Sequence, residues 1–284
     1  MTATIKTQGS QDCPATETSL ASQGLPGGSF KARVASYRLR CLRYAKALEN
    51  AIRPATVHKL RTHLRRLQSY AEFLEDSRDA ERLGRAVSWF SRLRALYELQ
   101  RYLHRNGATA KDCKRVEKAL RKEKKKIRDT ERPVAVRLLL AKITVERLMR
   151  PEEYITKRLQ RLQLENRTVL SEALQCLSSI PKRKELHRLR LLIKSLRYQQ
   201  EIAVEMRWGN PQTVNALKRL QTVLGEYTDL EQFLSLAKEL KLSCLKKIRK
   251  DRRRSRERAR RAVLKLKSEQ AQPLLPIRRS VTSV

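Results

Sequence analysis

Apolar residues recur every three or four positions from about residue 31 to residue 268, and this spacing places them on one side of a helix. Proline and glycine interrupt the pattern at only a few points, which predicts long helices joined by short connections. Asn106-Gly107 is typical of the residues that end a helix. We therefore expect an all-α protein. The expected helices cover about 31–52, 55–75, 79–104 and 109–132, an apolar-rich segment at 134–149, then 152–178, 182–206, a helix through Val214 and Leu224, and 234–267.

A helical motif occurs twice in this pattern. Residues 57–67 (VHKLRTHLRRL) return in altered form as residues 186–196 (LHRLRLLIKSL), and the two leading histidines are 129 positions apart (187 − 58). In each copy one face of the helix is basic and the opposite face is apolar. The basic faces consist of His58, Arg61, Arg65 and Arg66 in the first copy, and of His187, Arg190, Lys194 and Arg197 in the second.

A repeat with so long a period indicates a duplicated half-domain rather than a solenoid. We expect two pseudo-symmetric four-helix bundles, formed by about 31–150 and 151–268, that pack as one unit. Residues 1–30 are rich in Ser, Thr, Gln, Gly and Pro, so we expect a disordered leader. Residues 269–284 contain two prolines and are expected to form a flexible tail.

The two basic faces suggest a surface that binds anions. The alternative is that both are simply solvated, which is the usual role of charged residues on a helix. Against this alternative, the faces carry almost no acidic residues at i,i+4 spacing, so like charges repel along each helix. The whole chain has 65 Lys and Arg against 29 Asp and Glu, a net charge of +36, which also attracts polyanions. The basic run from Lys246 to Arg261 keeps a seam of apolar residues, so we expect a packed helix whose outer or pore-facing side adds to the cationic surface.

Each motif histidine precedes an arginine by three residues, and two roles remain open for it. It contacts the anion directly, or it has a structural role at the start of the helix. Neighbouring cations lower the pKa of a histidine and a bound phosphate raises it, so direct contact predicts tighter binding at mildly acidic pH. His58 and His63 are five residues apart and cannot share a metal ion as an i,i+4 pair can, so no metal site is expected.

Composition and motifs narrow the possible functions. Non-specific binding of nucleic acid is an alternative to binding of an inorganic anion, but aromatic residues make up only 5% of the chain, which disfavours base stacking. The chain has no E-x-E or D-x-D pair, no P-loop and no G-x-S-x-G motif. Glu226 and Asp229 are the best local carboxylate pair, and we expect them to neutralise nearby arginines. Neither an enzyme nor a bound cofactor is expected.

Location in the cell can also be inferred. The five cysteines are an odd, widely spaced set without a C-x-x-C pair, which fits a reducing compartment. Neither a secretory signal nor an apolar run long enough to span a membrane is visible. We expect a soluble cytoplasmic protein. Attachment to anionic membranes is an alternative that few aromatic anchors would support.

At the two motifs the chain resembles the conserved histidine α-helical domain, or CHAD, family. That family has two helical halves, each with a His-x-x-Arg-x-x-x-Arg/Lys helix followed by a Leu-Gly-x-x-x-Asp-Leu segment. Here the helices begin at His58 and His187, and the second segment is Leu224-Gly225-Glu226-Tyr227-Thr228-Asp229-Leu230. The resemblance covers about 31–268.

The resemblance implies binding of inorganic polyphosphate in a basic groove or pore between the two bundles, with location on polyphosphate granules and with polyphosphate-metabolising enzymes as partners. The implied ligand residues are His58, Arg61, Arg65, Arg66, His187, Arg190, Lys194, Arg197 and Tyr198. The chain departs from the family pattern at Gln68 and Ser195, where the family has further basic residues, and in the first Leu-Gly segment, which has degraded to Leu93-Arg94-Ala95-Leu96-Tyr97-Glu98-Leu99.

Overall fold

The computed structural model describes residues 30–178 and 181–269. Within these residues the chain forms helices and no strands, which confirms the all-α prediction. The helices are α1 (Phe30–Asn50), α2 (Pro54–Phe73), α3 (Ser77–Ser88), α4 (Ser91–Arg105), α5 (Ala110–Asp129), α6 (Arg132–Lys142), α7 (Val145–Leu148), α8 (Glu152–Gln175), α9 (Arg183–Glu205), α10 (Pro211–Glu239) and α11 (Leu245–Glu269). The predicted leader and tail lie outside the described residues, apart from Phe30 and Glu269. No helix in the described part of the chain is long and apolar enough to cross a membrane.

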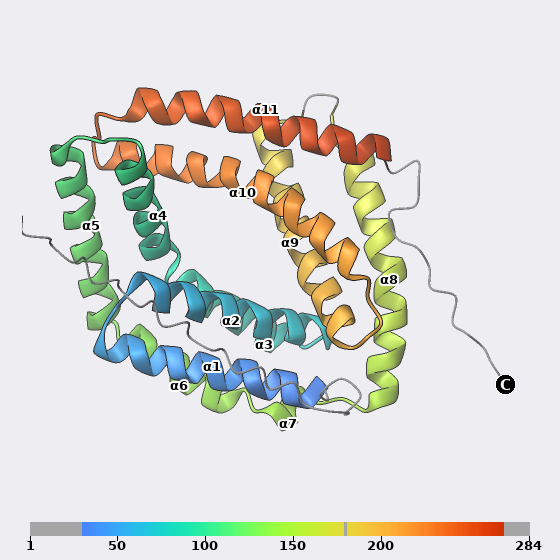
Figure 1. Ribbon diagram of the computed structural model, residues 1–284. Helices are drawn as coiled ribbons and strands as arrows, with labels where there is room; N and C mark the ends of the chain where they lie inside the picture. Colours follow the sequence, from blue (N-terminus) through green and yellow to red (C-terminus); the bar gives the residue numbers. More distant parts are fainter. Residues whose placement is uncertain (1–29, 179–180, 270–284) are drawn as a thin grey trace, which may run out of the picture.

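The helices form a closed frame around a central opening (Figure 1). The inner edge of the frame is made by α2, α4, α9 and α10, and the outer helices α1, α5, α8 and α11 run along its sides. The two helices that carry the repeated motif, α2 and α9, are therefore both on the inner edge. Their apolar faces point away from the opening, since Leu60, Leu64, Leu189 and Ile193 are buried.

Two hydrophobic cores hold the frame together. The first includes buried residues from α1 to α7, such as Leu64 and Phe90, and the second includes Ile193, Leu224 and Val263. Helices α8 to α11 contribute to both cores, because their two ends pack in different places. The predicted division of the chain near residue 150 remains a prediction, and the core packing crosses it.

The described part of the first half contains seven helices rather than four, because the expected helix 79–104 is divided and the apolar-rich segment 134–149 forms α6 and α7. The expected helix 79–104 ends at Ser88 and starts again at Ser91. Side chains satisfy the carbonyl groups at this break: Arg61 Nη1 donates to Val87 O at 2.7 Å, and Arg132 donates to Trp89 O. Guanidinium groups also interact favourably with the negative end of the α3 dipole.

The start predicted for the last helix, residue 234, is wrong. In the structure α10 continues to Glu239, and the last helix, α11, starts at Leu245. Lys241 adopts a left-handed conformation with φ of 51°, and the Leu242 amide donates to Ala237 O at 2.9 Å, which is the usual hydrogen bond of a Schellman helix end. The carboxylate of Asp112 on α5 accepts the Ser243 amide at 3.0 Å and the Ser243 hydroxyl at 2.7 Å. By contrast Gly107, expected to end a helix, does so with φ of 62°.

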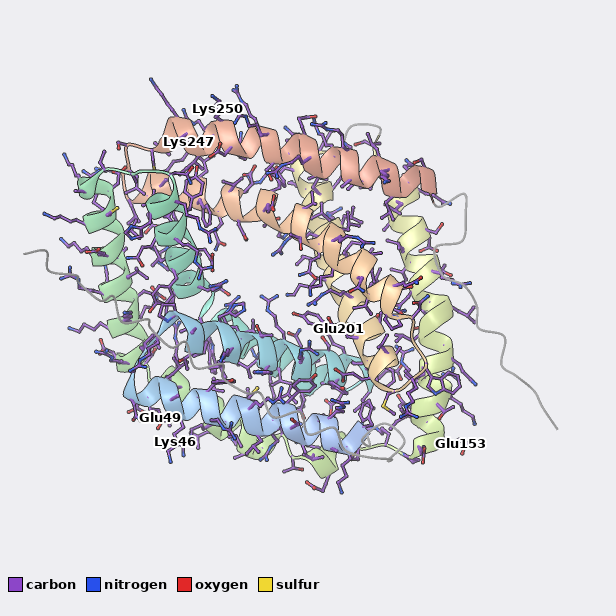
Figure 2. All side chains as sticks on the ribbon, viewed as in Figure 1. Lys46, Glu49, Glu153, Glu201, Lys247 and Lys250 are labelled. Atoms are coloured by element: carbon purple, nitrogen blue, oxygen red, sulfur yellow. The ribbon has the colours of Figure 1, made fainter. Side chains whose placement is uncertain are left out.

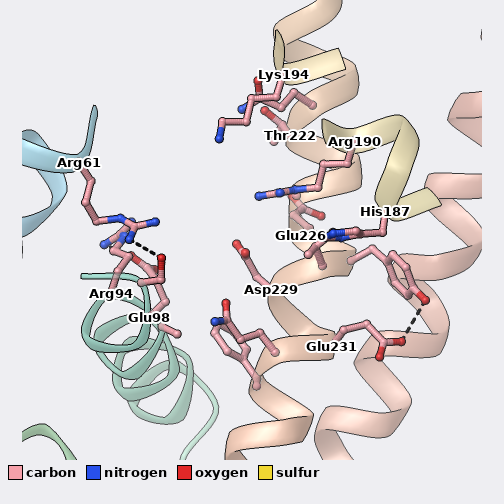
Figure 3. Close-up of a pocket in the computed structure, with 18 of the residues that line it drawn as sticks. Arg61, Arg94, Glu98, His187, Arg190, Lys194, Thr222, Glu226, Asp229 and Glu231 are labelled. Atoms are coloured by element: carbon pink, nitrogen blue, oxygen red, sulfur yellow. Dashed lines mark hydrogen bonds and ion pairs between the residues drawn. The ribbon is translucent and has the colours of Figure 1, made fainter. Parts of the chain in front are cut away.

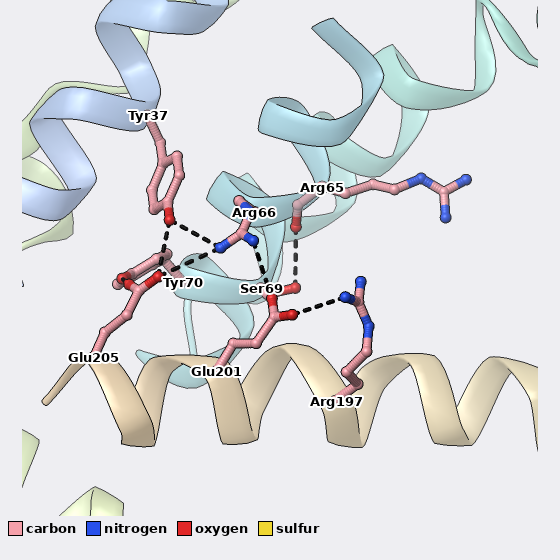
Figure 4. A network of polar contacts seen from close by, with 8 residues as sticks. All are labelled: Tyr37, Arg65, Arg66, Ser69, Tyr70, Arg197, Glu201 and Glu205. Atoms are coloured by element: carbon pink, nitrogen blue, oxygen red, sulfur yellow. Dashed lines mark hydrogen bonds and ion pairs between the residues drawn. The ribbon is translucent and has the colours of Figure 1, made fainter. Parts of the chain in front are cut away.

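A polar network joins α2 to α9 at the junction of the two halves (Figure 4). Arg66 forms ion pairs with Glu201 at 3.3 Å and with Glu205 at 3.4 Å. Arg197 pairs with the other oxygen of Glu201 at 2.7 Å. The hydroxyl of Tyr37 donates to Glu205 at 2.9 Å and accepts from Arg66 at 2.8 Å, and the Tyr70 hydroxyl also donates to Glu205. We call these six residues the junction network.

The junction network has electrostatic consequences for its members. Desolvation lowers the pKa of Arg66, but Tyr37, Glu201 and Glu205 outweigh it, so the net shift is upward. Burial raises the pKa of Tyr70 far above its usual value, and Glu205 adds to the shift. The network therefore holds Arg66 charged and Tyr70 protonated, each bonded to a carboxylate of α9.

We expect Glu205→Gln to destabilise the protein by about 1–3 kcal/mol, because Arg66 would lose one of its counter-charges and the two tyrosines a charged acceptor. Urea unfolding measures the change. Glu153→Gln is the control, since Glu153 forms an exposed i,i+4 pair with Lys157 that contributes little. Equal unfolding midpoints for the two variants would show that the junction network does not support the fold.

Two glycines are expected to respond oppositely to alanine. A Cβ at Gly209 would lie 2.6 Å from the backbone nitrogen of Val204, so Gly209→Ala should destabilise the protein by about 1–3 kcal/mol.

A Cβ at Gly225, inside α10, meets only Arg190 Nε at 4.0 Å, so Gly225→Ala should stabilise the helix by about 0.5–1 kcal/mol. Thermal unfolding of the two variants checks the signs, and a stabilising Gly209→Ala would contradict the described end of α9.

Candidate functional site

The opening of the frame contains a cavity with a volume of about 1170 Å³. We call it the central cavity. Side chains from the inner helices α2, α4, α9 and α10 form its walls (Figure 3). Both copies of the repeated motif therefore face one space, although they are more than a hundred residues apart in the chain.

Seven of the nine sequence-predicted ligand residues line the central cavity. They are His58, Arg61 and Arg65 from α2, and His187, Arg190, Lys194 and Tyr198 from α9. The remaining two, Arg66 and Arg197, do not line it. Their guanidinium groups belong to the junction network, where Glu201 lies between them. Arg66 follows Arg65 directly, so the 100° step of the helix turns it from the opening toward α1 and α9.

The α2 wall presents Arg61 and Arg65. Arg61 is held in place by its donation to Val87 O and to the hydroxyl of Ser91 at 2.8 Å. Desolvation and the neighbouring cations Arg65 and Arg94 lower the pKa of Arg61 to about 9. Desolvation also lowers the pKa of Arg65, with Tyr198 opposing and Arg190 adding to the effect. The positive charges on this wall are therefore crowded.

The α9 wall presents Arg190, Lys194 and Tyr198, with Arg190 and Lys194 pointing into the opening in Figure 3. The Nε atom of Arg190 is buried and has no hydrogen-bond partner in the described structure. Tyr198 is only 9% exposed, and the guanidinium carbon of Arg197 lies 4.2 Å from its ring centroid. Arg197 thus supports Tyr198 from behind while Tyr198 faces the cations of α2.

None of the cations Arg61, Arg65, Arg190 and Lys194 forms an ion pair with any described carboxylate. Grouping unpaired cations in a concave site costs electrostatic free energy, and an anion between them would recover it. Arginine also offers a planar fork of donors that matches phosphate oxygens. The arrangement is suited chemically to a multiply charged oxyanion.

The histidines of the first motif face opposite ways. His58 is exposed at the cavity, and its pKa is lowered by desolvation and by Arg94, with smaller contributions from other cations and an opposing one from Glu98. His63 instead stacks on Tyr44 with ring centroids 5.4 Å apart, and desolvation lowers its pKa to about 4. His187 is exposed and lines the cavity from α9. Among the histidines in the described part of the chain, His58 and His187 line the central cavity, and His63 does not.

Among the acidic residues of the cavity, Glu226 and Asp229 were singled out from the sequence, whereas Glu98 and Glu231 were missed. Glu98 on α4 and Asp229 on α10 both line the cavity, and they occupy matching positions in the two Leu-Gly-type segments. Glu98 pairs with Arg94, whereas Asp229 forms no ion pair with a described residue. Desolvation raises the pKa of Asp229, with Arg190 opposing and Glu98 adding. The correspondence of the two segments was the signal that could have identified Glu98.

The expectation that Glu226 and Asp229 neutralise arginines is met in part. Glu226 pairs with Arg258 on α11 at 3.2 Å, and Asp229 lies near Arg190 without forming an ion pair. A third carboxylate, Glu231, pairs with Arg183 and with Arg252, each at 3.3 Å. The cavity lining has eight Lys and Arg side chains against four carboxylates, so its net charge is positive.

Comparison with known proteins gives one informative result. No family model matches the chain, and no curated protein matches it either. Among solved structures, it is similar to the crystal structure of the CHAD domain from the plant Ricinus communis, with a TM-score of 0.58 and 15% sequence identity. The similarity covers 83% of this chain and 90% of the plant domain. The chain therefore has the fold of a CHAD domain, as its repeated histidine motif predicts.

Proposed function

We propose that the protein binds inorganic polyphosphate in the central cavity without catalysing a reaction on it. The observation that carries the proposal is the convergence of Arg61, Arg65, Arg190 and Lys194, without carboxylate partners, on one space. The CHAD fold supports it, because the family that the sequence resembles is associated with this polymer.

Polyphosphate meets the chemical requirements of the cavity. It is a linear chain that carries a negative charge on every phosphate, so successive oxyanions can contact cations from α2 and α9 at once. The arginines would bind phosphoryl oxygens in bidentate fashion, and Lys194 would act as a point charge. His58 and His187 would add hydrogen bonds, and the hydrogen bond from His58 would strengthen when its ring is protonated.

Non-specific binding of nucleic acid is the second candidate. It is supported by the net charge of +36 rather than by an aromatic surface, because aromatic residues make up only 5% of the chain and offer few partners for base stacking.

Binding rather than hydrolysis is supported by how the cavity carboxylates are used. Three of the four cavity carboxylates, Glu98, Glu226 and Glu231, are each in an ion pair with arginine, which leaves Asp229 as a single carboxylate without an ion pair to a described residue. Arginine-bound carboxylates are poor ligands for the divalent ions that phosphohydrolases use. We further propose a cytoplasmic location on polyphosphate granules, beside the enzymes that make or degrade the polymer.

Calorimetric titration with polyphosphate of defined length tests the proposal. We expect Arg190→Gln with Lys194→Gln to weaken binding by at least roughly tenfold, because each charge-assisted hydrogen bond is worth about 1.5–3 kcal/mol. The control removes two exposed cations of α5, Lys114→Gln with Lys118→Gln, and should bind like the wild type. Displacement of the polymer by duplex DNA at equal phosphate concentration would favour the nucleic-acid alternative and overturn the proposal.

The affinity should depend on pH in a defined direction. The pKa of His58 is lowered in the free protein and that of Asp229 is raised. A bound polyanion raises both pKa values, so binding takes up protons and tightens as the pH falls. Between about pH 7.5 and 5.5 we expect a gain on the order of tenfold.

Two variants separate the contributions to this pH dependence. His58→Ala with His187→Ala should weaken binding and flatten the profile, whereas Asp229→Asn should flatten it while strengthening binding at pH 7.5. Titrations at three pH values measure both. Unchanged affinity in the double histidine variant would assign both histidines to structural roles.

A further inference from the structure

Helix α11 carries a second group of cations on the side that faces away from the protein. We call this surface the outer face of α11. It consists of the exposed residues Lys246, Arg249, Lys250, Arg253, Arg254 and Arg261. Figure 2 shows Lys250 on α11 at the edge of the molecule. From Lys246 to Arg261 the face extends about 22 Å at 1.5 Å per residue.

The cations of the outer face are not used by the fold. The opposite side of α11 is buried through Ile248, Ala259 and Val263. The ion pairs of α11 involve other residues, and none of the six outer cations pairs with a described carboxylate. The spacings 246–250, 249–253 and 250–254 place like charges at i,i+4, which destabilises the helix. A solvated helix gains nothing from this pattern, whereas a polyanion along it would reverse the cost.

Ion pairs link the central cavity to α11. Glu226 and Glu231 of α10, which line the cavity, pair with Arg258 and Arg252 of α11. At the start of α9, Arg183 lines the cavity and is paired with the same Glu231. Near this point Arg260 of α11 donates to Pro181 O at 3.4 Å. The helix that carries the outer face is therefore fixed directly to the wall of the cavity.

We propose that the outer face of α11 is a second binding site, which takes the part of a long polyphosphate chain that extends beyond the central cavity. This inference rests on the proposed function of the cavity. A long polyphosphate chain continues past the rim of the cavity. The phosphates outside the cavity are also negatively charged and would be stabilised by cations there. α11 has no aromatic residue for base stacking. Its apolar side is buried through Ile248, Ala259 and Val263, and the exposed Leu264 alone is too little apolar surface to insert into a membrane.

The two sites together predict that affinity depends on chain length. A short polymer would occupy the cavity alone. A long polymer would engage both sites, and the second contact would form at a high effective concentration. The gain would come from electrostatics and counterion release, so it should also steepen the dependence on salt.

The test compares polymers of about ten and about a hundred phosphates, lengths that would reach one site or both. The variant Lys246→Gln, Lys250→Gln, Arg253→Gln and Arg254→Gln should bind the long polymer more weakly by on the order of tenfold to a hundredfold, with the short polymer unaffected. Its log–log salt slope for the long polymer should fall by roughly 3, by analogy with single-stranded nucleic acid. Circular dichroism verifies that α11 remains helical.

A matched control removes the same charge elsewhere. Lys114→Gln, Lys118→Gln, Arg121→Gln and Lys125→Gln change exposed cations of α5, a helix that contributes no residue to the cavity. Long-polymer binding that falls equally in both variants, or in neither, would overturn the second site. Displacement from the outer face by duplex DNA, with short-polymer binding intact, would assign that face to nucleic acid instead.

The proposed function and the second site fail in different ways. If the wild type does not bind the short polymer and Arg190→Gln with Lys194→Gln leaves long-polymer binding intact, the cavity proposal is wrong. Suppose instead that Arg190→Gln with Lys194→Gln weakens binding of both polymers, while the α11 variant and the α5 control change long-polymer binding by the same amount. The cavity proposal then stands and the second site is wrong.

Discussion

The architecture depends on bringing many positive charges close together without forcing the molecule apart. Two carboxylates of α9, Glu201 and Glu205, make this possible at the point where the halves meet. They pair with Arg66 and Arg197, so the junction of α2 and α9 is attractive although both helices are basic. With that junction neutralised, the remaining cations of the same helices can face the cavity unpaired.

The arginines of the repeated motif therefore serve two purposes. Arg66 and Arg197 are bonded to carboxylates and hold helices together. Arg65 and Arg190 lie within about two turns of them along the same helices but form no ion pair with a carboxylate in the described part of the chain. Arg61 does both, because it satisfies Val87 O at the end of α3 and still lines the cavity. This division explains how a cavity lined by more cations than carboxylates can exist inside a stable frame.

Much of the fold and part of the site could be predicted from the sequence. The apolar period marked the helices, Gly107 marked the end of α4, and the repeat brought His58, Arg61, Arg190 and Lys194 to one cavity. The end of α10 could not be predicted from the sequence. The left-handed position after this helix is occupied by Lys241 rather than by a glycine, and the apolar period continues past it. The position of this helix end is fixed by Asp112 from a distant helix, which no local pattern reveals.

The same limit applies to the site. Arg66 was assigned to the basic face because helix periodicity places it within 80° or so of His58. Which of two adjacent arginines meets solvent depends on the carboxylates of α9, and those lie far away in the chain. Glu98 and Asp229 occupy matching positions of two corresponding segments, but the sequence does not show that α4 and α10 bring them to the same cavity.

The first core combines residues of α1 to α7 with residues from one end of each of α8, α9, α10 and α11. The second core lies within α8 to α11 alone. Cutting the chain near residue 150 would therefore leave a second fragment that keeps a core of its own, whereas the first fragment and the cut-off ends of α8 to α11 would lose packing partners and expose apolar surface.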